Sequence, residues 1–239
     1  MEKIKIAADI ETIIDNKSET KTKRKVYFLF EKLSLMKDIF ELFIYGEGFK
    51  GYKEIKPLED NDIEKMDLYI STRKEIVTEL NSKGIASCYI DIDKQVDEKP
   101  IDGKDIVFGF DCDCVLFDDE AEVIYKKYGL DEFNSYEYKN KDNPMGPGPY
   151  YRFLKKMNWA KKKNSNLKLV ACSARHYPAN ERALCTFETW NIDFDAIFFC
   201  GSSNKGDVLL SVDTDIFFDD NVKNVEDVIR HGVLAGQVV

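Results

Sequence analysis

The sequence has no apolar run that approaches the length of a membrane span, and its first residues carry charges where a secretory signal peptide would be apolar. We therefore expect a cytoplasmic protein that does not bind a membrane. Histidine is also scarce, with two in 239 residues, and no arrangement of residues supports a histidine-based catalytic triad.

Positive charge is in the minority, because 35 lysines and arginines face 44 aspartates and glutamates, for a net charge of −9. This balance argues against binding of a nucleic acid polymer through its backbone. A small anionic substrate would need local positive charge or a metal ion to offset the field of the whole protein. The six cysteines lie in apolar, strand-like stretches, which indicates free thiols rather than a disulfide framework. A zinc site at Cys112 and Cys114 is a weaker alternative, because no second close pair follows.

Apolar stretches of strand length alternate with helix-like stretches along most of the chain. This alternation predicts an α/β protein with a doubly wound parallel sheet, and 44% hydrophobic residues are enough for a sizeable core. Residues 130–150 are polar, aromatic and rich in proline and glycine, and we assign no helix or strand to them from the sequence. A polar stretch at 93–104 is the best linker candidate, so we expect one unit at 1–100 and a second at 101–239.

The two halves of the chain resemble each other. Three stretches match in the same order: 9–11 with 111–113, 45–51 with 200–206, and 67–72 with 215–220. We predict that the first half is a shortened, degenerate copy of the second; the alternative is that buried strands simply look alike. Ser71 and Thr72 stand where the second half has two aspartates, so the first half could not balance the charge of a divalent cation. Changes at Asp9 or Lys50 are therefore expected to leave the chemistry intact.

Polar side chains follow four predicted strands of the second half. They are Asp111 and Asp113, Ser173, Lys205, and Asp219 with Asp220. Because the carboxyl ends of parallel strands meet at one edge of a sheet, we expect these groups to converge. Carboxylates suit Mg²⁺, while a hydroxyl and an ammonium can donate to phosphate oxygens. A carboxylate that faces a neutralised phosphate can act as a nucleophile and form an aspartyl-phosphate.

This ordered set resembles the haloacid-dehalogenase superfamily, which has Asp-x-Asp, Ser or Thr, Lys and Asp-Asp after successive strands. Shorter stretches resemble the type I, AMP-preferring cytosolic 5′-nucleotidases. They are 115–122, 143–149, 173–175, 182–190, 205–206 and 216–220. The resemblance covers roughly residues 105–239, and the sequence departs from the family in having Cys112 where glycine is usual and Ser173 where threonine is usual. It implies a small cap, roughly 118–165, inserted after the first motif.

The resemblance also implies a role for each motif residue. Asp111 would be the nucleophile and a metal ligand. Asp113 would protonate the leaving oxygen and then activate water, while its backbone carbonyl contacts the metal ion. Ser173 and Lys205 would hold the phosphate. Arg175 would either bind the phosphate as well or pair with a carboxylate.

Further residues are expected around the metal ion and the substrate. Asp220 would be a direct metal ligand, and Asp219 would act behind it or through water. Phe117, or an aromatic residue of the cap (Phe133, Tyr136, Tyr138, Tyr150 or Tyr151), could stack on a nucleobase, and Asn143 could hydrogen-bond a sugar or base.

The sequence therefore predicts a Mg²⁺-dependent 5′-nucleotidase that hydrolyses nucleoside 5′-monophosphates through an aspartyl-phosphate. One alternative is a phosphatase of the same superfamily that acts on a sugar phosphate or another small phosphometabolite. Another is a non-catalytic nucleotide-binding module. The sequence leaves a homo-oligomer open.

Overall fold

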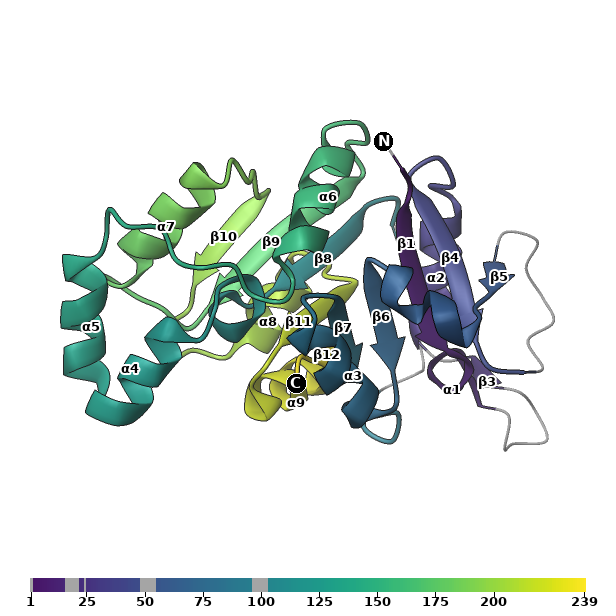
Figure 1. Ribbon diagram of the computed structural model, residues 1–239, viewed down its shortest axis with the longest axis horizontal. Coiled ribbons are helices and arrows are strands. Elements are labelled where there is room, and N and C mark those ends of the chain that lie inside the picture. Colours follow the sequence, from purple (N-terminus) through teal and green to yellow (C-terminus); the bar gives the residue numbers. More distant parts are fainter. Residues whose placement is uncertain (1, 16–21, 24, 48–54, 96–102) are drawn as a thin grey trace.

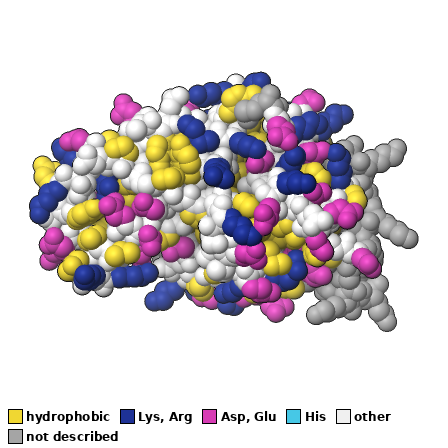
Figure 2. Space-filling view, in the orientation of Figure 1, with side chains coloured by type: hydrophobic (Ala, Val, Ile, Leu, Met, Phe, Trp, Pro, Cys, Tyr) yellow, Lys and Arg dark blue, Asp and Glu magenta, His cyan; other side chains and the backbone are white. Residues whose placement is uncertain are grey.

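The computed structural model describes residues 2–15, 22–23, 25–47, 55–95 and 103–239. Lys50 and most of the expected linker lie outside the described residues. None of the described helices is both long and apolar enough to cross a membrane. On the face shown in Figure 2, acidic and basic side chains are interspersed, so the negative net charge is not gathered into one patch there.

The centre of the protein is a ten-stranded sheet with the order β10-β9-β8-β11-β12-β7-β6-β1-β4-β5 (Figure 1). In chain order its strands are β1 (Ile4–Asp9), β4 (Phe40–Tyr45), β5 (Ile55–Pro57), β6 (Leu68–Ser71), β7 (Ala86–Tyr89), β8 (Ile106–Phe110), β9 (Leu167–Ser173), β10 (Ala196–Phe199), β11 (Ile216–Asp219) and β12 (Leu234–Gln237). Neighbouring strands are parallel except β7 and β12, which meet antiparallel through Tyr89 and Gln237. A separate two-stranded sheet joins β2 (Ile14–Asp15) to β3 (Thr22–Lys23). The prediction of an α/β fold with a mostly parallel sheet is confirmed.

Nine α-helices are described. They are α1 (Ile10–Ile13), α2 (Lys25–Ser34), α3 (Lys74–Ser82), α4 (Glu120–Tyr128), α5 (Leu130–Lys139), α6 (Tyr151–Lys161), α7 (Asn180–Thr189), α8 (Lys205–Ser211) and α9 (Val222–Arg230). Helix α5 occupies the first half of the stretch 130–150, to which the sequence had assigned no helix. Helices α4 and α5 form the left end of the molecule in Figure 1, beyond the edge of the sheet.

Strand β8 is buried on both faces, as its unbroken apolar run predicts. On one face, the rings of Phe108 and Phe110 pack edge-on against Phe153 of α6. On the other face, Val107 lies in a cluster with Leu209 of α8 and with α9. Helices therefore cover both faces of the sheet. Strand β8 is an interior strand of the sheet, between β9 and β11.

The strand order repeats in the two halves, as β5-β4-β1-β6-β7 and β10-β9-β8-β11-β12. By position, β4 corresponds to β9, so the alignment of 45–51 with 200–206 matched β4 to the wrong strand, β10. The sequence comparison found no counterpart of the strand that ends at Ser173 in the first half, but the structure has one there, which is β4. That the first half is a degenerate copy, and that 1–100 and 101–239 are separate domains, stay predictions.

Candidate active site

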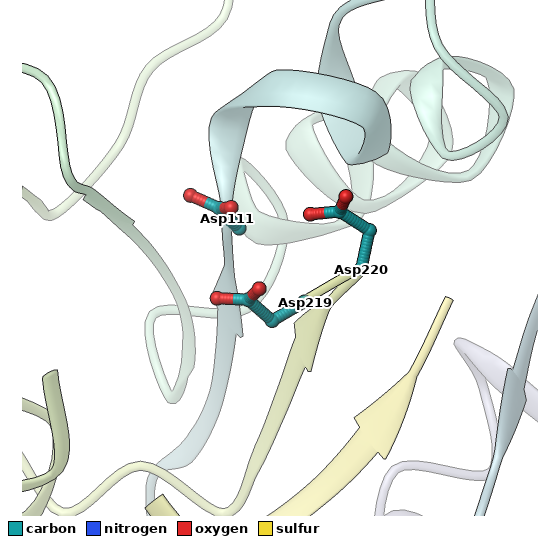
Figure 3. A group of neighbouring side chains, drawn as sticks. All are labelled: Asp111, Asp219 and Asp220. Carbon is teal, nitrogen blue, oxygen red and sulfur yellow. The ribbon is translucent and has the colours of Figure 1, made fainter. Parts of the chain in front are cut away.

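The sheet brings the predicted carboxylates together at its carboxyl edge. Strand β11 pairs directly with β8, and the backbone N–H of Asp111 donates to the carbonyl of Phe218 at 2.8 Å. Asp219 and Asp220 then follow on the neighbouring strand, beside Asp111 (Figure 3). Oxygen atoms of the three carboxylates all lie within 4.8 Å of one another.

Lys205 reaches this cluster from the start of α8, which follows β10. Its side chain is buried, and its Nζ lies 2.8 Å from Oδ1 of Asp111 and 2.7 Å from Oδ2 of Asp219. The start of α8 is tied to α9, because the backbone N–H of Gly206 donates to Asp227 at 3.0 Å. Burial alone would lower the pKa of Lys205, but the two carboxylates outweigh it and raise that pKa. The ammonium therefore stays charged.

One ammonium does not balance three carboxylates. Burial, followed by the charge of Asp219, raises the pKa of Asp111 to about 7 in spite of Lys205. Burial and Asp111 raise the pKa of Asp220 to about 6. The site therefore has an excess of negative charge that a bound cation would relieve, and hard carboxylate oxygens are the ligands that Mg²⁺ prefers. The residues present fit a divalent metal ion.

The carboxylate of Asp219 is held by the protein itself. Its Oδ1 accepts the backbone N–H of Asn221 at 2.8 Å, and both of its oxygens accept the side-chain amide of Asn224, at 3.2 and 3.0 Å. With Lys205 on Oδ2, the Asp219 carboxylate has several donors. It can orient Lys205 without binding a metal ion directly.

Ser173 ends β9, the strand on the other side of β8. It is buried, and its Oγ accepts the backbone N–H of Arg175 at 3.2 Å. Its hydroxyl thus lies at the same edge of the sheet as Asp111.

Asp113 lies in the kinked turn Cys112–Leu116 that follows β8; its own backbone is extended, with φ −68° and ψ 139°, and Cys114 has a φ of 60°. This turn sends the side chain of Asp113 toward Arg175. The Arg175 Nε lies 2.8 Å from Asp113 Oδ2, and its Nη2 lies 2.6 Å from Oδ1. Arg175 therefore pairs with a carboxylate, one of the two roles expected for it.

A cavity of about 540 Å³ opens beside these groups. Asp111, Asp113 and Asp220 line one part of it. A second part is apolar and comes from helices α4 and α5, where the Tyr125 and Phe133 rings meet edge-on with centroids 6.0 Å apart, next to Leu130. The cavity thus combines an acidic end with an aromatic wall.

Of the residues expected to bind the rest of the substrate, Phe133 lines this cavity, whereas Phe117, Tyr138 and Asn143 are not among the described residues that line it. Phe117 is buried against the rings of Phe187 and Trp190. Tyr138 lies near the end of α5 and is 49% exposed. The side-chain amide of Asn143 donates to Oδ1 of Asn140 at 3.3 Å.

Sequence reasoning missed Tyr125 and Leu130. Tyr125 looked like an ordinary surface residue of a predicted helix, and Leu130 lay in a polar stretch to which no helix was assigned.

A family model described as 5′-nucleotidase matches residues 41–239. The chain belongs to the 5′-nucleotidase family. Human cytosolic 5′-nucleotidase 1B is 32% identical over 179 residues, which are 71% of this chain and 29% of that protein. The chain thus spans about 29% of this curated relative's length. The predicted resemblance to the cytosolic 5′-nucleotidases is confirmed, and the family match extends into the first half, beyond the 105–239 stretch in which the resemblance was seen.

Two solved structures of the HAD domain of the effector protein Lem4 from Legionella pneumophila, one of an inactive mutant, also align with this member of the 5′-nucleotidase family. Each has a TM-score of 0.35 and covers 55% of this chain. The identities are 15% and 14%, and the alignments cover 83% and 82% of the Lem4 chains.

Proposed function

We propose that this protein is a Mg²⁺-dependent 5′-nucleotidase that hydrolyses nucleoside 5′-monophosphates to nucleoside and phosphate. The observation that carries the proposal is the cluster of three carboxylates and Lys205 at one end of a cavity whose other wall is aromatic. Membership of the 5′-nucleotidase family supports it. We also propose a cytoplasmic location, in line with the cytosolic relative.

In this proposal a metal ion would be held by Asp111, Asp220 and the backbone carbonyl of Asp113. Asp219 acts behind them, because the backbone of Asn221 and the side chains of Asn224 and Lys205 already occupy its oxygens. A bound Mg²⁺ would supply positive charge that offsets the charge of the phosphate.

The reaction has two steps in the same site. A carboxylate oxygen of Asp111 attacks phosphorus, the bond from phosphorus to the 5′-oxygen breaks, and its electron pair stays on that oxygen, which takes the proton of Asp113. Water then gives a proton back to Asp113 and attacks phosphorus, which releases phosphate and restores Asp111. Ser173 and Lys205 donate to the phosphate oxygens throughout, so that placement and charge neutralisation supply most of the catalysis.

The nucleoside would lie against the cap. Tyr125, Leu130 and Phe133 offer an apolar and aromatic surface, which suits the face of a nucleobase better than a bare sugar. This wall favours the nucleotidase over a phosphatase for sugar phosphates or other small metabolites. The cluster of carboxylates with Lys205 favours it over a non-catalytic nucleotide-binding module.

A substrate panel tests the proposal. Wild-type protein and Asp111→Asn are incubated with Mg²⁺ and a set of nucleoside monophosphates and sugar phosphates, and released phosphate is measured. We expect wild type to prefer nucleoside monophosphates and Asp111→Asn to release none. Preference for sugar phosphates would establish the first alternative, and nucleotide binding without Mg²⁺-dependent turnover would establish the second.

A further inference from the structure

Arg175 is 3% exposed, and all five N–H groups of its guanidinium have acceptors. Two of them bind Asp113, at 2.8 and 2.6 Å. Two on Nη1 bind Glu137 and, at 2.9 Å, the carbonyl of Ala179, and the last on Nη2 lies 3.4 Å from the sulfur of Met145. A phosphate oxygen could bind this guanidinium only by displacing one of these partners.

The partner opposite Asp113 belongs to the cap. Glu137 lies on α5 with 0% exposure, and it is shared by Arg175 and Arg182, whose Nη1 lies 2.9 Å from Oε1. Arg182 also binds Glu120 of α4 at 2.8 Å. The ring of Phe133, one helical turn before Glu137, lies 5.4 Å from the Arg175 guanidinium. Helix α5 therefore holds Arg175 through both a carboxylate and a ring.

We propose that Arg175 is a positioning residue, which fixes the carboxylate of Asp113 for proton transfer to the leaving oxygen and is itself fixed by Glu137 of the cap. This inference rests on the proposed function. A bidentate guanidinium–carboxylate pair fixes the plane of the carboxylate as well as its distance from the guanidinium. Arginine keeps its charge at every usable pH, so the proton that leaves Asp113 is not drawn from Arg175.

The linkage gives the cap a part in the chemical step. With α5 in place, Glu137 and Asp113 hold the guanidinium from opposite sides. If α5 moved, the Glu137 contact would be lost and Asp113 would no longer be held in one orientation. A displacement of about 1 Å at a reacting group can cost roughly 10²-fold in rate.

The test uses two phosphate esters that differ in their need for a proton. A nucleoside leaves as an alkoxide and needs the proton of Asp113, whereas 4-nitrophenolate leaves readily without one. The first turnover of each ester is measured with Mg²⁺ by rapid quench, for wild type, Arg175→Lys and Arg182→Lys. Arg182→Lys is the matched control, because Arg182 also binds Glu137 but does not contact Asp113 in the structure.

For Arg175→Lys we expect the first turnover of a nucleoside monophosphate to slow by about 10²-fold, within the range of general acid catalysis, with little change in KM. The first turnover of 4-nitrophenyl phosphate should change by no more than a few-fold. Arg182→Lys should slow the two esters equally, if at all. Glu137→Gln keeps an acceptor oxygen and serves as a second variant if Arg175→Lys fails to fold; it should show the leaving-group dependence of Arg175→Lys in weaker form.

Equal slowing of both esters by Arg175→Lys or, where that variant does not fold, by Glu137→Gln would overturn the inference. A raised KM with an unchanged first turnover would also overturn it, since it would make Arg175 a phosphate ligand. The same leaving-group dependence in Arg182→Lys would do so as well. If wild type cleaves 4-nitrophenyl phosphate but no nucleoside monophosphate, the proposed function fails instead, and glycerol phosphate replaces the nucleotide in the comparison. No turnover of any ester would overturn both.

Discussion

Replacing Lys32 by methionine tests how the first half is joined to the half that carries the site. Lys32 lies on α2, and its Nζ is 2.7 and 3.0 Å from the two oxygens of Asp215, just before β11. Asp215 is 0% exposed and also accepts the backbone N–H of Val107 at 2.8 Å. Lys32→Met keeps the length of the side chain but leaves a carboxylate buried without its cation.

The size of the effect follows from burial. Removing one partner of a buried ion pair costs about 3–5 kcal/mol, because the remaining charge cannot regain its water. Burial already raises the pKa of Asp215 above its ordinary value of 3.8, with Lys32 opposing the rise, so the pKa rises further in Lys32→Met. An acid with a higher pKa in the folded state contributes stability at low pH that is lost as pH rises through the folded pKa. The penalty should therefore be largest at neutral pH and shrink as pH falls toward 3.8.

The assay is urea unfolding of wild type, Lys32→Met, Asp215→Asn and the double variant, with the free energy of unfolding compared in a double-mutant cycle. We expect Lys32→Met to lose about 3–5 kcal/mol and the double variant to regain much of it, because asparagine carries no charge and still accepts from Val107. A loss below about 1 kcal/mol, as for an exposed pair, would refute the reasoning. So would a double variant whose loss equals the sum of the single losses.

Three further predictions concern the site, and a fourth concerns the first half of the chain. Lys205→Met should lower kcat by about 10²-fold or more in steady-state assays, because a preorganised donor to the phosphate is lost. Mg²⁺ at about 100 times its Kd should stabilise wild type by about 2.7 kcal/mol in thermal unfolding, and Asp220→Asn should lose most of this gain while keeping its fold. Tyr125→Ala should raise KM for nucleoside monophosphates, whereas Tyr138→Ala, outside the cavity, should not. Asp9→Asn should leave the first turnover unchanged among molecules that remain folded; a specific loss there would contradict a non-catalytic first half.

The groups at the strand ends could be predicted from the sequence because parallel strands have few ways to pair. The apolar run before Asp111 predicts a buried strand with a polar end from the local sequence alone. The same holds for Ser173 and Asp219. The similarity between the two halves was less informative, because buried strands share one apolar pattern. For that reason β4 was matched to β10 and not to β9.

Helix α5 and the aromatic wall could not be predicted in the same way. A glutamate in the sequence pattern predicts an exposed position. Glu137 is nevertheless fully buried, because Arg175 and Arg182 neutralise its charge. With a charged residue on its buried face, α5 loses the apolar period that marks a helix. Which aromatic side chains face the cavity depends on how α4 and α5 sit on the sheet, so Tyr125 and Tyr138 could not be told apart.

The central claim is that Asp111 attacks phosphorus. Its most direct test is acid quenching during turnover of a nucleoside monophosphate with Mg²⁺, followed by mass spectrometry of the peptide that contains residue 111. We predict one added phosphoryl group on this peptide in wild type, lost on treatment with hydroxylamine, and none in Asp111→Asn. A phosphoryl group on another peptide, or turnover by Asp111→Asn at the wild-type rate, would contradict the account.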